Sequence, residues 1–220
     1  MAIEVFAGTL DRYYSDVESA EEAARTHEIV THWMDTIVAA VKKAAPEAEA
    51  WEERADKECV VVQMDELHYG ALLYYAASVA YNAKPREAIY PGWKAEEEQA
   101  VQSAHADPNM PWSLMKGASW WLPAQTPVLL RGEVPTGDVV TISSCGALLL
   151  ELLRVNEMGW KADESEVLSW FETEGQMAEG AKHYSTESMA KYAFSALWQL
   201  SKYGLQNHVP VIMDAVEEEA

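Results

Sequence analysis

The 220-residue chain lacks several features that would define its class. Its two cysteines, Cys59 and Cys145, cannot build the disulfide framework of a small secreted domain. A chain of this length can bury a sufficient core without disulfides or metals. No segment reaches the ~20 consecutive apolar residues of a membrane span, and the N-terminus has no signal-peptide pattern. We therefore expect a cytoplasmic protein with reduced thiols and no membrane association.

Basic residues are also scarce. Sixteen Lys and Arg stand against 36 Asp and Glu, a formal net charge of −20. Phosphate contacts need clustered basic residues, so the composition argues against a nucleic-acid partner, and anionic membrane surfaces would repel the chain. The charge favours a basic protein partner, although acidity can also serve solubility alone. Nine Trp and ten Tyr indicate a folded interior despite the charge.

The charge is distributed unevenly along the chain. Residues 111–160 carry three basic and four acidic groups, whereas 1–110 carry nine and 21, and 161–220 carry four and 11. We expect the near-neutral middle to lie inside the fold, between two acidic flanks.

Helical patterns dominate. Ser19 and Glu22 form an S-x-x-E capping box before an apolar stripe at spacings of three and four, which predicts a helix from about Ser19 to Ala45. Similar patterns predict helices over 65–83, 93–104, 144–158, 163–178 and 185–203, and a short one over 209–216. We expect the core to centre on Leu67 to Val79, Leu148 to Val155 and Met189 to Leu200.

Two segments depart from the helical pattern. Val128 to Val134 and Val139 to Ser143, joined by Pro-Thr-Gly-Asp, predict a hairpin that Ile3 to Phe6 could extend. Residues 85–127 hold six of the nine prolines and four of the nine Trp, so this segment should be irregular but pinned. We therefore predict a mainly α fold: one helical domain over 1–220 with a small β-hairpin element. A two-domain split near Pro108 to Pro127 is the alternative.

The weak catalytic candidates are Cys145 and Ser144, at a strand-to-helix junction. Aligned peptide dipoles at a helix start lower a thiol pKa and favour the nucleophilic thiolate. The G-x-S-x-G pattern of a nucleophile elbow is absent. The simpler interpretation is that Ser143 caps the helix and Cys145 packs as a small apolar side chain.

The weak metal candidates are Glu28, His32 and Asp35, which share one face of the first long helix. His27 and His32 are five residues apart, so the run does not match the H-E-x-x-H zinc motif. His27 lies on the apolar stripe, and we expect it to be a hydrogen-bonded core histidine. A solvated helix face is the commoner explanation for the other three, so we expect no cofactor.

The binding candidates lie in the proline- and tryptophan-rich segment, because Trp is enriched at binding hot spots. They are Trp93, Trp112, Trp120 and Trp121, with Glu96, Glu97 and Glu98 as acidic contacts. The alternative is that these Trp cover the core beneath a long loop.

The first hypothesis for function is a non-catalytic acidic binding protein that recognises and neutralises a basic protein partner. Small cytosolic immunity proteins, which block a cognate toxin, are often acidic and rich in Trp, and the chain is similar to them in composition alone. The second hypothesis is a small helical enzyme that uses Cys145 or a cation on Glu28, His32 and Asp35. A structural or regulatory role is the third.

Overall fold

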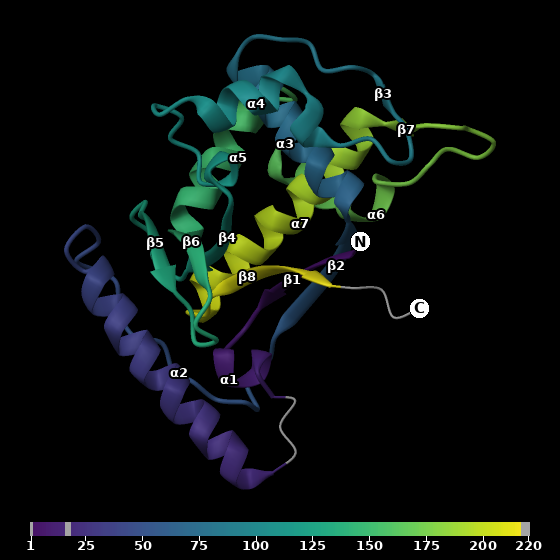
Figure 1. Ribbon diagram of the computed structural model, residues 1–220. Coiled ribbons are helices and arrows are strands. Elements are labelled where there is room, and N and C mark those ends of the chain that lie inside the picture. The colour runs from purple at the N-terminus through teal and green to yellow at the C-terminus, as the bar shows by residue number, and fades with distance from the viewer. Residues whose placement is uncertain (1, 16–18, 217–220) are drawn as a thin grey trace.

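The computed structural model describes residues 2–15 and 19–216, and Figure 1 shows a mixed β-sheet with helices on both faces. The sheet has the strand order β2-β1-β8-β4-β6-β5. Its strands are β1 (Ala2–Ala7), β2 (Val60–Asp65), β4 (Ala118–Leu122), β5 (Leu129–Glu133), β6 (Val139–Ser144) and β8 (Val211–Val216). Neighbouring strands run antiparallel except β4 and β6, which are parallel. The prediction of a mainly α fold is therefore wrong, and the protein is mixed α/β.

The helices lie in two unequal layers. The larger layer, on one face of the sheet, contains α3 (Glu66–Ala80), α4 (Gln99–Ala106), α5 (Cys145–Met158), α6 (Glu164–Thr173) and α7 (Thr186–Asn207). The short 3₁₀ turns η1 (Ala95–Glu97) and η2 (Leu114–Lys116) belong to the same layer. The other face packs against α1 (Leu10–Tyr13) and α2 (Ala20–Val41). Outside the sheet, β3 (Ala88–Ile89) pairs with β7 (Tyr184–Ser185).

The central strands serve both layers, because successive side chains of a strand point to opposite faces. Val5 and Val211 lie in the larger core, whereas Phe6 and Ile212 lie in the core beneath α2. Strands buried on both faces read as short apolar runs rather than as alternating patterns. This is why the sequence pattern does not distinguish them from helix or loop.

The helix-start signals are confirmed. The Ser19 hydroxyl accepts a hydrogen bond from the Glu22 amide at 3.2 Å, and α2 begins at the next residue. The three predicted core segments, on α3, α5 and α7, all line the larger core. The first turns of α2 extend beyond the sheet, however, so Ala23 and His27 of the predicted apolar stripe are exposed.

The strand predictions are mixed in outcome. The hairpin is confirmed as β5 and β6, and Ile3 to Phe6 does form a strand, but β1 pairs with β2 and β8 rather than with the hairpin. Residues 209–216 form β8 instead of a helix. Trp120 and Trp121 lie in β4 instead of an irregular segment, because β4 fills the place between β8 and β6.

The helix predicted over 185–203 is longer in the structure, where Gly204 lies inside α7. A Cβ atom on Gly204 would lie 3.0 Å from both the Cys145 sulfur and the Val209 carbonyl oxygen, so glycine permits a close approach here. The helix ends instead at His208, whose φ of 54° is left-handed. In the ranges 2–15 and 19–216, no helix is long and apolar enough to cross a membrane.

Candidate functional site

The predicted nucleophile is inaccessible. Cys145 is completely buried, and its thiol donates to the Trp121 carbonyl oxygen at 3.5 Å. Burial raises the pKa of Cys145, so desolvation outweighs the helix dipole that would favour a thiolate. The prediction that Ser143 caps the helix is wrong by one residue: Ser143 is still in β6 and donates to the Val128 carbonyl at 2.8 Å. Ser144 is the N-cap of α5: its hydroxyl accepts from the Ala147 amide at 3.1 Å and donates to the Thr126 carbonyl at 3.0 Å. The side chains of Cys145 and Ser144 therefore act in the packing and capping of α5.

The predicted cation ligands do not converge with others. Glu28, His32 and Asp35 are exposed along α2. Among the described residues, no group of three His, Cys, Asp or Glu side chains is arranged to hold a metal ion. His27 is hydrogen-bonded as expected but is not a core residue, because its side chain is 54% exposed.

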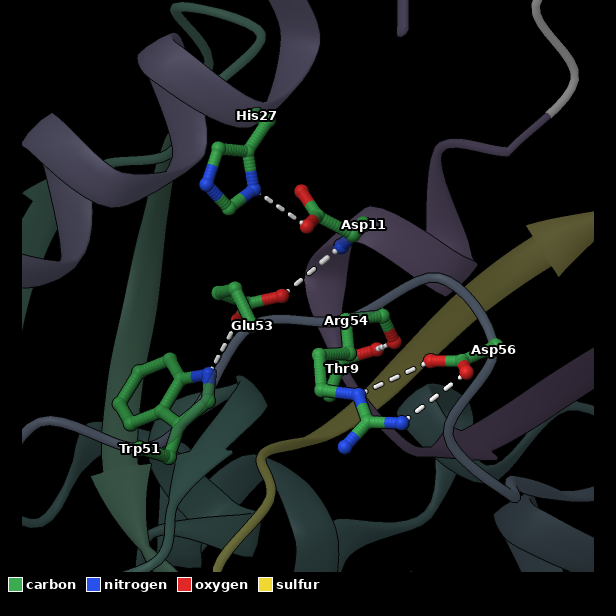
Figure 2. A network of polar contacts seen from close by, with 7 residues as sticks. All are labelled: Thr9, Asp11, His27, Trp51, Glu53, Arg54 and Asp56. Carbon is green, nitrogen blue, oxygen red and sulfur yellow. Dashed lines mark hydrogen bonds and ion pairs between the residues drawn. The ribbon is translucent and has the colours of Figure 1, made fainter. Parts of the chain in front are cut away.

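A polar network ties α2 to the rest of the molecule, as Figure 2 shows. The Nδ1 atom of His27 lies 2.5 Å from the Asp11 carboxylate, and the Asp11 amide donates to Glu53 at 2.9 Å. The Trp51 indole donates to the other oxygen of Glu53, and the desolvation of Glu53 raises its pKa. These residues come from three separate segments, so no local spacing in the sequence could reveal the network.

The same region is closed by two further contacts. The Thr9 hydroxyl donates to the Arg54 carbonyl oxygen at 2.7 Å, and the Arg54 guanidinium binds Asp56 through two hydrogen bonds of 3.0 Å. These contacts hold segment 51–56 against α1. We interpret the network as a structural support for α2.

The predicted aromatic anchors belong mainly to the interior. Trp112, Trp120 and Trp121 are buried and leave little surface for a partner to contact. Trp93 is half-buried, and its indole donates to Glu98 at 2.8 Å. Glu98 also pairs with Arg86 at 2.7 Å. Glu96 and Glu97 are exposed on η1 beside this cluster.

A different surface is exposed in the structure: the outer edge of β2. Within the described ranges, β2 is the last strand of the sheet and pairs only with β1. A strand edge of this kind presents backbone groups that can pair with another chain. Val61, in the middle of β2, is 46% exposed.

One face beside this edge is acidic. Glu4 of β1 lies directly opposite Gln63 of β2, whose amide donates to it at 3.4 Å, and opposite Asp214 of β8; we call the two carboxylates, Glu4 and Asp214, the acidic row. The Tyr13 hydroxyl donates to Asp214, and partial burial together with the facing Glu4 raises the pKa of Asp214. Facing carboxylates on adjacent strands repel each other, so a cation placed between them would be favoured.

The opposite face beside the edge is an apolar groove of about 390 Å³, which we call the β2 groove. Its walls include Val60 and Val62 from β2, Leu168 and Phe171 from α6, and Tyr203 from α7. Leu168 is 42% exposed, so its side chain is accessible to a partner in this groove. An ion pair between Glu164 and Lys202 lies on the rim.

Two backbone carbonyl groups along this edge already accept hydrogen bonds from tyrosine side chains. The hydroxyl of Tyr203 donates to the Glu58 carbonyl at 3.1 Å, and that of Tyr192 donates to the Gln63 carbonyl at 3.3 Å. These hydroxyls mark the two ends of the stretch that contains Val60, Val61 and Val62.

Comparison with known protein families, curated proteins and solved structures finds no match to this chain, so its function is inferred from the geometry of the molecule.

Proposed function

We propose that the protein is a non-catalytic acidic binding protein whose partner is a basic protein. The observation that carries the proposal is the edge of β2, which has the acidic row on one face and the β2 groove on the other. An extended segment of the partner adds to β2 as a further antiparallel or parallel strand. Strand addition draws affinity from main-chain hydrogen bonds and specificity from alternate side chains.

The two faces define the sequence that fits. Because side chains of a strand alternate, one set would enter the β2 groove and the other would lie beside Gln63 and extend towards Glu4, the nearer carboxylate of the acidic row. The segment recognised is therefore one of alternating apolar and Lys or Arg residues. Apart from the buried Glu53 and Glu151, every acidic side chain of the described residues is at least partly exposed. This negative surface charge would attract a basic partner over a long range.

Neutralisation of the partner follows if the captured segment is needed for the partner's own activity. Immunity proteins likewise block a cognate toxin, and the chain is similar to them in composition alone.

The experiment uses an eight-residue peptide of alternating Val and Lys, with a Val and Glu peptide as its matched control. We expect the Val and Lys peptide to perturb the backbone amide resonances of β2. Replacing Glu4 by Lys should weaken its binding about tenfold, the effect of a charge contact of ~1.4 kcal/mol. Doubling the salt concentration should weaken it as well, because surface charges are screened.

Two further variants localise the site. Leu168→Ser, in the β2 groove, should weaken binding, whereas Leu129→Ser should not, because Leu129 is similarly exposed but lies on β5 at the other end of the sheet. Equal losses in the two variants, or equal affinity for the Lys and Glu peptides, would refute docking at β2.

A further inference from the structure

A second cavity, of about 300 Å³, lies along α5 and is separate from the β2 edge. Its apolar walls include Trp112, Val128, Leu129 and Leu150, and its polar lining includes Glu151 and Arg154 of α5. We propose that this cavity binds a small zwitterion with an apolar side chain, of the α-amino acid class. Glu151 binds the ammonium group and Arg154 binds the carboxylate.

Glu151 is the buried charged group of the cavity lining. Its side chain is buried, with 6% of the residue exposed, and it accepts hydrogen bonds from the Ser113 amide at 2.6 Å, the Ser113 hydroxyl at 3.1 Å and the Leu114 amide at 3.2 Å. All three donors are neutral, and no cationic side chain of the described residues lies within ion-pair distance. Burying a carboxylate without a counter-charge is unfavourable, and a ligand ammonium would supply that charge.

Arg154 is the exposed charged group of the cavity lining. It lies three residues after Glu151, on the neighbouring face of the same helix, and it is exposed. Within 2–15 and 19–216 it has no acidic partner at ion-pair distance, Glu151 included. A guanidinium binds carboxylates through two parallel hydrogen bonds. The opposite charges of Glu151 and Arg154 disfavour a simple amine or a simple acid relative to a molecule that carries both.

The size and walls of the cavity limit the rest of the ligand. Its volume is at the small end of the range for small-molecule pockets, which suits a single amino acid rather than a peptide. Leu129 and Leu150 are both about half exposed on the rim. The apolar side chain of the ligand would cover them, so leucine and phenylalanine are the probes that match.

The protonation of Glu151 gives the site a pH dependence. Burial raises the pKa of Glu151 to about 7. The titratable or charged groups near it are Tyr69 on α3, whose own pKa is raised by burial first and by Glu151 second, and Arg154 on α5. The ammonium group requires the ionised form of Glu151, so affinity should rise between pH 6 and pH 8.

The test is calorimetric titration of the full chain at pH 8 with L-leucine and L-phenylalanine, beside two analogues of leucine. Isopentylamine lacks the carboxylate, and 4-methylpentanoate lacks the ammonium group. We expect saturable binding of at least one amino acid and at least tenfold weaker binding of each analogue. Absence of saturable binding by both amino acids would overturn the proposal, as would analogues that bind as well as leucine.

Variants assign the two charges. In Glu151→Gln, leucine should lose its advantage over 4-methylpentanoate but keep its advantage over isopentylamine; in Arg154→Gln the pattern should be the reverse. Glu53→Gln, at the other buried carboxylate of the described chain, is the matched control and should leave both preferences unchanged. Preferences that do not change in the two cavity variants would refute the assignment.

Because the cavity is separate from β2, the Val and Lys peptide should bind Arg154→Gln normally, so this test and that of the proposed function fail independently.

Discussion

The clearest quantitative consequence of the structure is the titration of Glu151. Its pKa is raised by burial from an ordinary value of 4.5 to about 7, and the three hydrogen bonds from Ser113 and Leu114 oppose that shift only in part. A raised pKa means that folding favours the protonated carboxyl group. The contribution to stability is therefore complete below about pH 4.5 and is lost as the pH rises through about 7.

The size of the effect follows from the two pKa values. Each pKa unit of difference between the folded and unfolded states corresponds to about 1.4 kcal/mol, so the full loss is roughly 3 kcal/mol. Most of this loss, about 2.5 kcal/mol, falls between pH 5 and pH 8. That change is a substantial fraction of the stability of an average domain.

The assay is urea unfolding of the wild type and of Glu151→Gln at pH 5, 6, 7 and 8. Subtracting the two stability curves removes every titration that the proteins share. We expect the wild type to lose roughly 2 to 3 kcal/mol relative to Glu151→Gln over this range. Glu28→Gln, at an exposed carboxylate of α2, controls for the change of net charge. Parallel curves for the wild type and Glu151→Gln would show that the carboxylate is not buried as described, and the reasoning would fail.

Two other perturbations test the packing around α5. Gly146→Ala would place a Cβ atom on the carbonyl oxygen of Gln125, a backbone atom that cannot move away, so the melting temperature should fall sharply. Gly70→Ala should lower it less, because the added Cβ would lie 3.2 Å from the nearest atom, the Ala95 Cβ, and needs only a small shift; similar melting temperatures for the two variants would contradict the contact at Gly146. In native protein, a thiol reagent should modify Cys59 and leave Cys145 unmodified until denaturant is added, because Cys145 is completely buried and its pKa is raised; rapid modification of both cysteines would show that the start of α5 opens.

The helices could be predicted from the sequence because the patterns that specify them are local. A cap such as Ser19 or Asp163 and an apolar spacing of three and four residues act within one or two turns. The same holds for the β5 and β6 hairpin, whose turn residues are adjacent in the chain. The burial of the apolar segments on α3, α5 and α7 follows from the same patterns.

The sheet and the candidate sites were decided only by the tertiary structure. β1 acquires its partners from β2 and β8, and the latter lies some two hundred residues further along the chain. A strand as short as β4, which is buried on both faces, carries no period that separates it from a helix. Glu151 has the same local pattern as any helical glutamate, and only the docking of η2 at Ser113 makes it a buried acid. Local sequence determines where the chain turns and coils, whereas charge burial, strand pairing and cavities depend on which distant segments meet.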